Sequence, residues 1–475
     1  MEQPTATEQI DIEKAFQAIR KKAIVTRNEP LAARKSRLKK LQAWIENNNA
    51  AIQQAVYEDF KKPAEEADIS EIYPVMTEIR EALSNLKTWA KPSHVEAPLT
   101  MVTTSSEIQY EPRGACLIIA PWNYPFNLAI GPLIPCLAAG NTAIIKPSEM
   151  TPHTSELIAR MIADIFNPEE VHVINGGVDV SQQLLALPFD HIFFTGSPQV
   201  GKIVMRAAAD HLTSVTLELG GKSPAIIDQE ADLKDAAEKI AWGKFLNNGQ
   251  TCIAPDYVII DKSQTQRFEQ VLIEATNRLF SNNGDFKSSS AYGRIVNEKH
   301  FNRLNALLHD ALNKGATLLL GGDMEADANY MSPTVLGNIG PDMEVSDEEI
   351  FGPILPIIEV GSLEETIEYI NAKPKPLALY YFGKSKANRK RVLSQTSSGN
   401  VCVNDCMIHF GHPNLPFGGV NHSGIGKSHG KAGFLEFSNQ KGVLKQRVGF
   451  TATKLVYPPY TGTTRKIINL LKKFF

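Results

Sequence analysis

The sequence predicts an α/β fold in which two doubly wound sheets are accompanied by a small β arm. Two observations carry this prediction. The chain has 475 residues, more than one hydrophobic core usually supports, so we expect two or three domains. Short apolar runs also alternate with helical segments in two successive blocks, which is typical of parallel sheets covered by helices on both faces.

The N-terminal part of the chain is predicted to be helical. From about residue 10 to 91, apolar residues such as Leu38 and Leu41 recur at helical spacing between charged residues. Pro92 and Pro98 close this region, because proline disfavours continuation of a helix.

A half-exposed β arm is predicted next. Met101 to Tyr110 alternates in polarity like a strand with one solvated face. The last strand-like piece, Gly442 to Arg447, is a candidate partner for it. We therefore assign residues 99–112 and 436–448 to one arm.

The first α/β block begins at Gly114. Its apolar runs predict parallel strands buried on both faces, at 116–120, 142–145, 171–174, 192–194 and 215–219. Segments of helical period lie between them, at 155–166 and 200–212. In such a sheet, ligands bind at the C-terminal ends of the strands.

A second α/β block follows Gly220 and Gly221. It has predicted helices at 264–279 and 300–313 and predicted strands at 354–358, 378–382 and 401–403. The expected division is 1–98 with 113–219 as one domain, 220–422 as a second, and 449–475 as a C-terminal tail.

Composition and charge indicate an enzyme that acts on small molecules in a reducing, cytoplasmic setting. Forty-nine basic and 52 acidic residues give a net charge of -3, which argues against nucleic acid as a partner. Five cysteines, an odd number spread over much of the chain, do not resemble a disulfide framework. We see no apolar run of the length of a signal peptide or a membrane span.

Three short segments carry candidate chemistry. Asn247 to Cys252 ends a helical segment in a loop that presents one cysteine, although a lone cysteine is more often a small buried hydrophobe. Glu218 lies at the C-terminal end of a strand that is otherwise buried, where a carboxylate needs a partner or a function such as general base. Asn123 follows the first strand, and its amide could hold an oxyanion or form a local turn before Pro125.

In this order and spacing, the three segments resemble the aldehyde dehydrogenase superfamily over roughly residues 10 to 447. Residues 249–257 and 415–419 are similar to the dimeric class three branch, which includes fatty and aromatic aldehyde dehydrogenases. The resemblance implies oxidation of an aldehyde to an acid by NAD, with NADP also usable. It implies Cys252 as nucleophile, Glu218 as base, Asn123 in the oxyanion hole, a homodimer, and no metal.

The same resemblance implies the cofactor residues. Lys146 and Glu149 would meet the adenosine ribose, and Glu349 with Phe351 would hold the nicotinamide ribose and ring. Trp122 is expected beside them. The 1–98 and 113–219 domain would bind the dinucleotide, the 220–422 domain would be catalytic, and the arm would serve in oligomerisation.

The turn from 194 to 202 is the candidate pyrophosphate site. It leads from a strand into a helix, so backbone N–H groups around Gly196, Ser197 and Gly201 can receive phosphate oxygens. The turn is also nearly a Walker A loop, but Ile203 stands where a serine or threonine would bind magnesium, which disfavours a P-loop phosphotransferase.

Two rival functions are distinguished by the presence of Cys252 and Glu218. A CoA-acylating dehydrogenase would share Cys252 but would not need Glu218, and a non-catalytic nucleotide-binding protein would not need either. Zinc at 402–412 is disfavoured because the cysteine pair and the histidine pair abut. Asn421 departs from the family pattern, in which glycine is more frequent, so the geometry of that loop, expected near the substrate mouth, stays open.

The tail has the pattern of a short amphipathic helix. From Arg465 to Phe475, apolar residues share one face opposite basic residues, and 11 residues cannot span a bilayer. Three hypotheses remain: packing on the protein or across a dimer, contact with a membrane surface, and gating of the substrate funnel, which fatty aldehyde dehydrogenases show.

Overall fold

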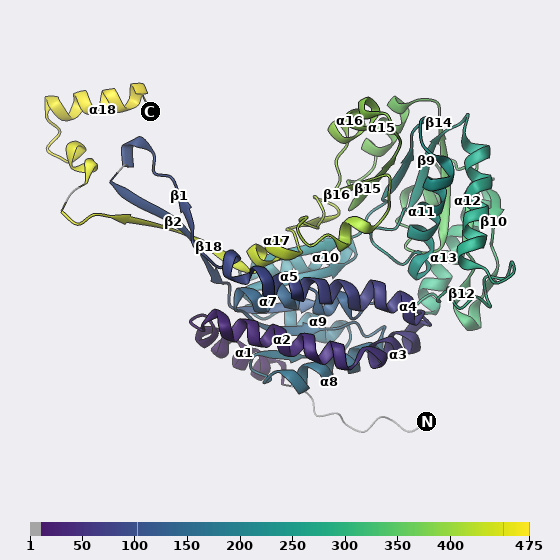
Figure 1. The fold of residues 1–475 in the computed structure, drawn as a ribbon, viewed down its shortest axis with the longest axis horizontal. Helices are drawn as coiled ribbons and strands as arrows, with labels where there is room; N and C mark the ends of the chain where they lie inside the picture. The colour runs from purple at the N-terminus through teal and green to yellow at the C-terminus, as the bar shows by residue number, and fades with distance from the viewer. Residues whose placement is uncertain (1–10, 102, 450, 475) are drawn as a thin grey trace.

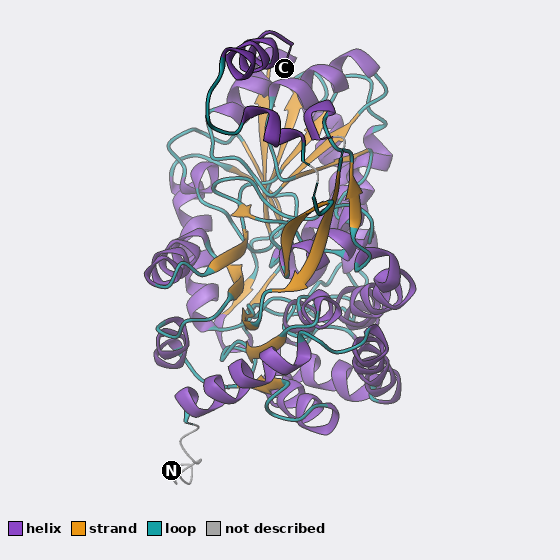
Figure 2. Ribbon diagram, turned by 90° about the vertical axis from the view of Figure 1, so that its left-hand side faces the viewer, coloured by secondary structure: helices purple, strands orange, loops and turns teal. Residues whose placement is uncertain are grey.

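The computed structural model describes residues 11–101, 103–449 and 451–474. Two α/β layers lie side by side, and a β arm projects from them with a helix at its far end (Figure 1). In the perpendicular view, helices surround the strands of both layers (Figure 2). The predicted fold class is confirmed.

The N-terminal region is helical as predicted, and its helices cover the first sheet. They are α1 (Ile12–Thr26), α2 (Leu31–Asn47), α3 (Asn49–Phe60), α4 (Ala64–Ala67), the π-helix η1 (Asp68–Ile72) and α5 (Tyr73–Trp89). Leu38 and Leu41 of α2 are fully buried, as their helical spacing predicted.

The first sheet has six strands in the order β17-β7-β6-β3-β4-β5. The bounds are β3 (Ala115–Ile119), β4 (Thr142–Lys146), β5 (Val171–Val173), β6 (His191–Gly196), β7 (Ser214–Leu219) and β17 (Gly424–Ile425). β3 to β7 are parallel, and only β17, from a segment that the predicted division left unassigned, is antiparallel. Each of the five predicted strands is present within one or two residues.

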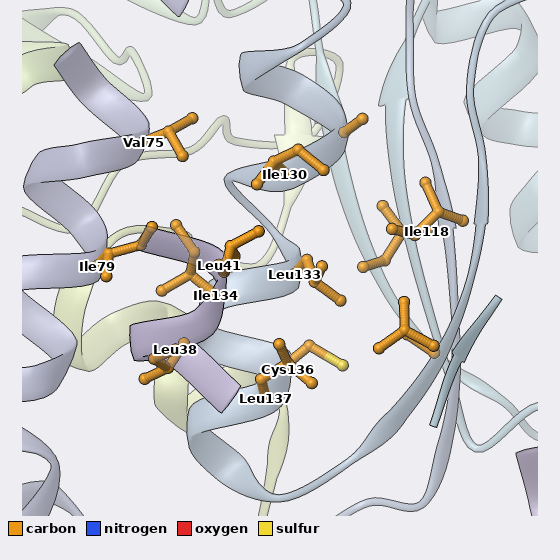
Figure 3. Packing of buried hydrophobic residues seen from close by; sticks show 14 of the residues in the cluster. Leu38, Leu41, Val75, Ile79, Ile118, Ile130, Leu133, Ile134, Cys136 and Leu137 are labelled. Carbon is orange, nitrogen blue, oxygen red and sulfur yellow. The ribbon is translucent and has the colours of Figure 1, made fainter. Parts of the chain in front are cut away.

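Helices connect the end of each parallel strand from β3 to β6 to the start of the next strand along the chain. They are α6 (Asn127–Ile130), α7 (Leu133–Ala139), α8 (Pro152–Ile165), α9 (Val178–Leu185) and α10 (Pro198–Asp210). Every residue of α7 is buried, because α2 and α5 cover the side that faces away from the sheet. Figure 3 shows residues of these three helices packed together beside Ile118 of β3. Each fully buried leucine or isoleucine contributes about 1.5–3 kcal/mol of transfer free energy.

The second sheet has seven strands in the order β10-β13-β14-β9-β8-β15-β16. The bounds are β8 (Pro224–Ile227), β9 (Tyr257–Asp261), β10 (Thr317–Leu320), β13 (Thr334–Gly337), β14 (Ile354–Val360), β15 (Ala378–Phe382) and β16 (Asn400–Val403). Its helices are α11 (Leu233–Phe245), α12 (Thr265–Phe280), α13 (Glu298–Asn313), α14 (Glu344–Asp347), α15 (Leu363–Asn371) and α16 (Lys386–Gln395). A two-stranded antiparallel ribbon, β11 (Met324–Glu325) with β12 (Tyr330–Met331), falls between β10 and β13 in the sequence.

The arm is a three-stranded antiparallel sheet of β1 (Ser93–Val95), β2 (Thr104–Pro112) and β18 (Ser438–Gln446). Pairing runs from Ser438 opposite Pro112 to Gln446 opposite Thr104, which confirms the predicted pairing of the two arm segments. α17 (Gly430–Glu436) leads into β18 and packs on α5 and α7.

The tail forms α18 (Gly462–Phe474), which packs on the short helix η6 (Ala452–Val456). In Figure 1, α18 lies at the far end of the arm, away from both large sheets. Ile467, Ile468 and Leu471 are half-buried, whereas Leu470 is exposed. Phe475, which the predicted apolar face included, lies outside the described residues. No helix in the described part of the chain has the length and apolar character needed to cross a membrane.

Candidate active site

Cys252 is presented by a loop with unusual backbone geometry. After α11, Asn247 and Asn248 adopt left-handed conformations, with φ of 53° and 54°, which asparagine tolerates better than most residues. Gln250 then fixes the loop, donating to the carbonyls of Asn247 and Arg294 at 3.1 Å each. The loop therefore holds Cys252 partly exposed, while the other four cysteines are buried.

Glu218 lies at the end of β7, on the same face as Thr216, and both side chains are buried. Its Oε1 accepts a hydrogen bond of 3.0 Å from the Ser428 hydroxyl, and its Oε2 has no hydrogen-bond partner among the described residues. Burial raises the pKa of Glu218 to about 8, against the opposing effects of Ser428 and Lys427. A buried carboxylate with one free oxygen suits proton transfer near neutral pH.

Asn123 is tied to the cysteine loop. Its side-chain amide nitrogen donates to the Gln250 carbonyl at 2.9 Å, and its backbone carbonyl accepts from the Asn247 side-chain amide at 2.8 Å and from Lys62 at 3.3 Å. The side chain therefore bonds across the site to a residue far along the chain. One N–H of the amide is used in this bond, which leaves the second for an oxyanion.

Two large cavities meet at Cys252. A polar cavity of about 600 Å³ is lined by Cys252, Glu218 and Asn123. An apolar cavity of about 650 Å³ is lined by Cys252 and by aromatic residues that include Tyr73, Trp242 and Phe410. The three predicted chemical residues thus lie together, with the thiol at the junction of the two cavities.

The polar cavity also gathers five of the predicted cofactor residues, which are Trp122, Gly196, Ser197, Glu349 and Phe351. The Trp122 and Phe351 rings meet edge to face, 5.3 Å between centroids. Ser197 caps the N-terminus of α10, where free backbone N–H groups favour an anion.

Three predicted cofactor residues lie outside the lining of that cavity. Lys146, at the end of β4, forms an ion pair with Glu149. Gly201 is buried, and a Cβ there would lie 2.7 Å from the Leu219 side chain, so the glycine allows α10 to pack closely on β7. Gly201 therefore serves helix–sheet packing.

Comparisons with known proteins agree with this geometry. Residues 1–443 match the model of the aldehyde dehydrogenase family. The chain belongs to the aldehyde dehydrogenase family. It is 46% identical over 436 residues to the putative aldehyde dehydrogenase AldX of Bacillus subtilis, covering 92% of this chain and 98% of the relative. It is 42% identical to the mouse aldehyde dehydrogenase family 3 member A2, covering 91% and 88%.

Solved structures of aldehyde dehydrogenases share this fold over more than nine-tenths of the chain. The substrate-bound AldH of Staphylococcus aureus superposes with a TM-score of 0.92 at 41% identity, covering 97% of this chain and 99% of that chain. A Mycobacterium tuberculosis aldehyde dehydrogenase complexed with NAD⁺ superposes with a TM-score of 0.85 at 27% identity, covering 93% and 91%. This chain is an NAD(P)-dependent aldehyde dehydrogenase with family 3 relatives.

In this aldehyde dehydrogenase, two carboxylates set the electrostatics around the thiol. Burial, followed by the charges of Glu349 and then Glu218, raises the pKa of Cys252 to about 12. Burial also raises the pKa of Glu349 to about 8, while Lys222 and Arg303 lower it. The thiol is therefore neutral at physiological pH unless the surrounding charge changes.

Sequence reasoning missed residues that shape the polar cavity. Lys222 forms an ion pair with Asp256 and donates to the carbonyls of Val345 and Glu348 at 2.9 and 2.8 Å, which holds the turn before Glu349. Its position directly after two strand-terminal glycines was the available signal.

Two further cavity residues come from α13. The His300 ring packs at a tilt against Trp122 with 4.8 Å between ring centroids, and Arg303 donates to the Ile350 carbonyl at 2.6 Å. Nothing in the sequence distinguished them from a solvated helix face.

The structure also shows the conformation of the loop that contains Asn421 and the arrangement of the side chains that could bind a metal ion. Asn421 adopts a left-handed φ of 54° and accepts from Lys375 at 2.9 Å, so it keeps a conformation that glycine would favour. Its neighbour His422 lines the polar cavity rather than the apolar one. In the described part of the chain, no group of three or more His, Cys, Asp or Glu side chains could hold a metal ion.

Proposed function

We propose that this enzyme oxidises long-chain aliphatic or aromatic aldehydes to carboxylic acids through a thioester on Cys252. The observation that carries the proposal is the position of Cys252 at the junction of an apolar and a polar cavity. An apolar aldehyde in the first cavity would bring its carbonyl carbon to the thiol, and a dinucleotide would enter the second.

Each step has a residue suited to it. The Cys252 thiol loses its proton to solvent, its thiolate sulfur attacks the carbonyl carbon, and the free N–H of Asn123 with the Cys252 backbone N–H would hold the oxyanion. Loss of hydride leaves an acyl thioester. Glu218 then takes a proton from water, whose oxygen attacks the thioester and releases the acid and the thiol. A CoA thiol as acyl acceptor would not require the buried Glu218.

The polar cavity fits a nicotinamide dinucleotide. Glu349 packs so closely against Gly220 that a Cβ there would lie 2.3 Å from its carboxylate oxygens, a cradle that holds the carboxylate at the strand end. Glu349 and Phe351 would hold the nicotinamide ribose and ring, with Trp122 beside them. Gly196 and Ser197 would receive the pyrophosphate at the start of α10, which Gly201 allows to pack closely on β7. When bound, the dinucleotide supplies the acceptor for the hydride.

Lys146 and Glu149 are proposed to meet the adenosine ribose at the end of β4. An exposed carboxylate on Glu149 would repel a 2′-phosphate, while Lys146 would tolerate one, so we propose that NAD is favoured and NADP is usable. Residues 1–98 and 113–219 would form the dinucleotide-binding domain, and 220–422 the catalytic domain.

We further propose that the enzyme is a cytoplasmic homodimer with peripheral contact to a membrane; the arm supports the dimer, and the tail supports the membrane contact. β18 is an edge strand of the arm and is mostly exposed, with Leu444 54% accessible, so a second copy could cover it. α18 carries basic residues beside apolar ones, which suits an interfacial helix. These assignments define an oligomerisation arm at 99–112 and 436–448 and a tail at 449–475.

Rapid mixing tests the proposed roles. Glu218→Gln should release up to one NADH per site in a burst and then stop, and Cys252→Ala should release none. Steady turnover of Glu218→Gln at the wild-type rate would contradict the base assignment. An aldehyde panel with both NAD and NADP, followed by NADH absorbance, tests the substrate class, and a preference for short polar aldehydes would contradict it.

A further inference from the structure

We propose that Ser428 is a positioning residue for the base, whose hydroxyl holds one carboxylate oxygen of Glu218 and leaves the other to accept a proton from water. The inference rests on the role proposed above for Glu218. Ser428 Oγ lies 3.0 Å from Glu218 Oε1, although the residues are 210 positions apart in the chain. Glu218 Oε2 is buried and has no hydrogen-bond partner among the described residues.

The Ser428 hydroxyl is itself held in place. Its backbone N–H donates to the Phe417 carbonyl at 2.6 Å, and its carbonyl accepts from the Phe417 N–H at 3.1 Å. The Ser428 hydroxyl lies 3.4 Å from the same Phe417 carbonyl, farther than from Glu218. Because that carbonyl already accepts a short hydrogen bond, the Ser428 hydroxyl donates its hydrogen bond to the Glu218 carboxylate.

The same segment also encloses the carboxylate. A Cβ at Gly418 would lie 3.1 Å from Glu218 Oε1, so the glycine makes room for the carboxylate. At the end of β7, Gly424 pairs directly with Glu218. Residues 417–428 therefore build both the space for the carboxylate and its hydrogen-bond donor.

Other charged and titratable groups face Glu218 without bonding to it directly. Lys427 donates its ammonium to the carbonyls of Gly418 and Gly419. Glu436 accepts from the Lys427 backbone N–H at 3.1 Å and from Thr216 at 3.2 Å.

Further titratable neighbours of Glu218 lie across cavities. The Cys252 thiol lines the polar cavity with Glu218, and Glu78 and His429 line a small cavity of about 60 Å³ with it. Lys427 lowers the pKa of Glu218 and Glu436 raises it, so these two charges oppose each other.

The direction of the effect follows from the hydrogen bond. Ser428 stabilises the ionised carboxylate and lowers its pKa against burial. Removing the hydroxyl raises that pKa further and leaves a smaller ionised fraction at neutral pH. A hydrogen bond to a charged group corresponds to roughly one pKa unit, or about tenfold in that fraction at pH 7.

The test measures deacylation directly. Full-length enzyme is mixed with benzaldehyde and NAD, the excess is removed, and decay of the acyl mass on the Cys252 peptide is followed by mass spectrometry from pH 6 to 10. Ser428→Ala should form acyl-enzyme at the wild-type rate, lose it about tenfold more slowly at pH 7, and move the pH midpoint of decay upward by about one unit. Ser428→Thr, which keeps the hydroxyl, should restore the wild-type midpoint.

Ser423→Ala is the matched control. Its buried hydroxyl lies in the same loop but bonds to the backbone of Val420, 2.9 Å from the nitrogen, so its loss should leave the midpoint in place. If Ser428→Ala does not fold, Ser428→Cys keeps a weak donor and should shift the midpoint in the same direction.

The two proposals fail differently. If acyl-enzyme decay is slow in Glu218→Gln but the pH midpoint of decay is unshifted in Ser428→Ala, the positioning role alone is overturned. An equal shift of the midpoint in Ser423→Ala overturns it too. Acyl-enzyme decay at the wild-type rate in Glu218→Gln overturns the role of the base on which it rests.

Discussion

Replacing Glu349 with Gln should speed alkylation of Cys252 in alkaline solution but not in acid. Ionised Glu349 is, after burial, the largest cause that raises the pKa of the Cys252 thiol. Burial raises the pKa of Glu349 itself to about 8, so its carboxylate is neutral well below that pH. The repulsion of the thiolate therefore grows as the pH rises through about 8, and only there can the substitution relieve it.

The baseline rate can be worked out. At pH 9 a thiol with a pKa of about 12 is ionised to about one part in 10³, whereas a free cysteine with a pKa of about 8.5 is about three-quarters ionised. The intrinsic nucleophilicity of a thiolate rises with the pKa of its thiol, with a Brønsted coefficient of about 0.4–0.5. The ionised Cys252 sulfur should therefore react roughly 25- to 55-fold faster than the ionised sulfur of free cysteine, which offsets part of its low ionised fraction. Cys252 should thus react roughly 15- to 30-fold more slowly than free cysteine.

Iodoacetamide labelling of the cofactor-free enzyme, read by mass spectrometry of the Cys252 peptide, measures this rate. The other four cysteines are buried and should not compete. Glu348→Gln is the matched control, because Glu348 is the exposed neighbour of Glu349. The ratio of Glu349→Gln to wild type should be near one at pH 6.5 and clearly above one at pH 9.5. Equal rates for both variants at pH 9.5, or a wild-type rate equal to that of free cysteine at pH 9, would refute the electrostatic argument.

Three further predictions concern packing, cofactor choice and the tail. Gly201→Ala should lower the free energy of unfolding by about 1–3 kcal/mol, because its Cβ would lie 2.7 Å from Leu219, whereas Gly442→Ala, with open space around it, should not; thermal melts compare them. Glu149→Gln should raise kcat/KM for NADP relative to NAD. A wild-type preference for NADP would contradict the assignment of the Glu149 carboxylate to the adenosine ribose. Truncation after Tyr460 should abolish co-sedimentation with anionic vesicles at low salt; a changed chain-length profile would instead support gating, a lowered Tm alone would support a packed tail, and failure of the full-length chain to sediment would exclude the membrane role.

The sheets were predictable where strands are buried on both faces and separated by clear helices. β3, β4 and β7 show this pattern, and each begins and ends within one or two residues of the expectation. In the second sheet, β8, β9, β10 and β13 were missed. β8 has four residues and starts at a proline, and a short apolar run of this kind cannot be told from a loop or helix by periodicity.

The candidate site divides in the same physical way. Glu218, Gly196 and Asn123 lie at or just after strand ends, and the C-terminal ends of parallel strands meet at one edge of a sheet, so local pattern alone brings them together. Ser428 reaches Glu218 only because β17 pairs antiparallel with β7 at the edge of that sheet. Two residues long and glycine-led, β17 has no periodicity of its own. Residues whose role depends on a contact between distant segments therefore become visible only in the folded chain, and such residues tune a site whose principal groups the sequence already indicates.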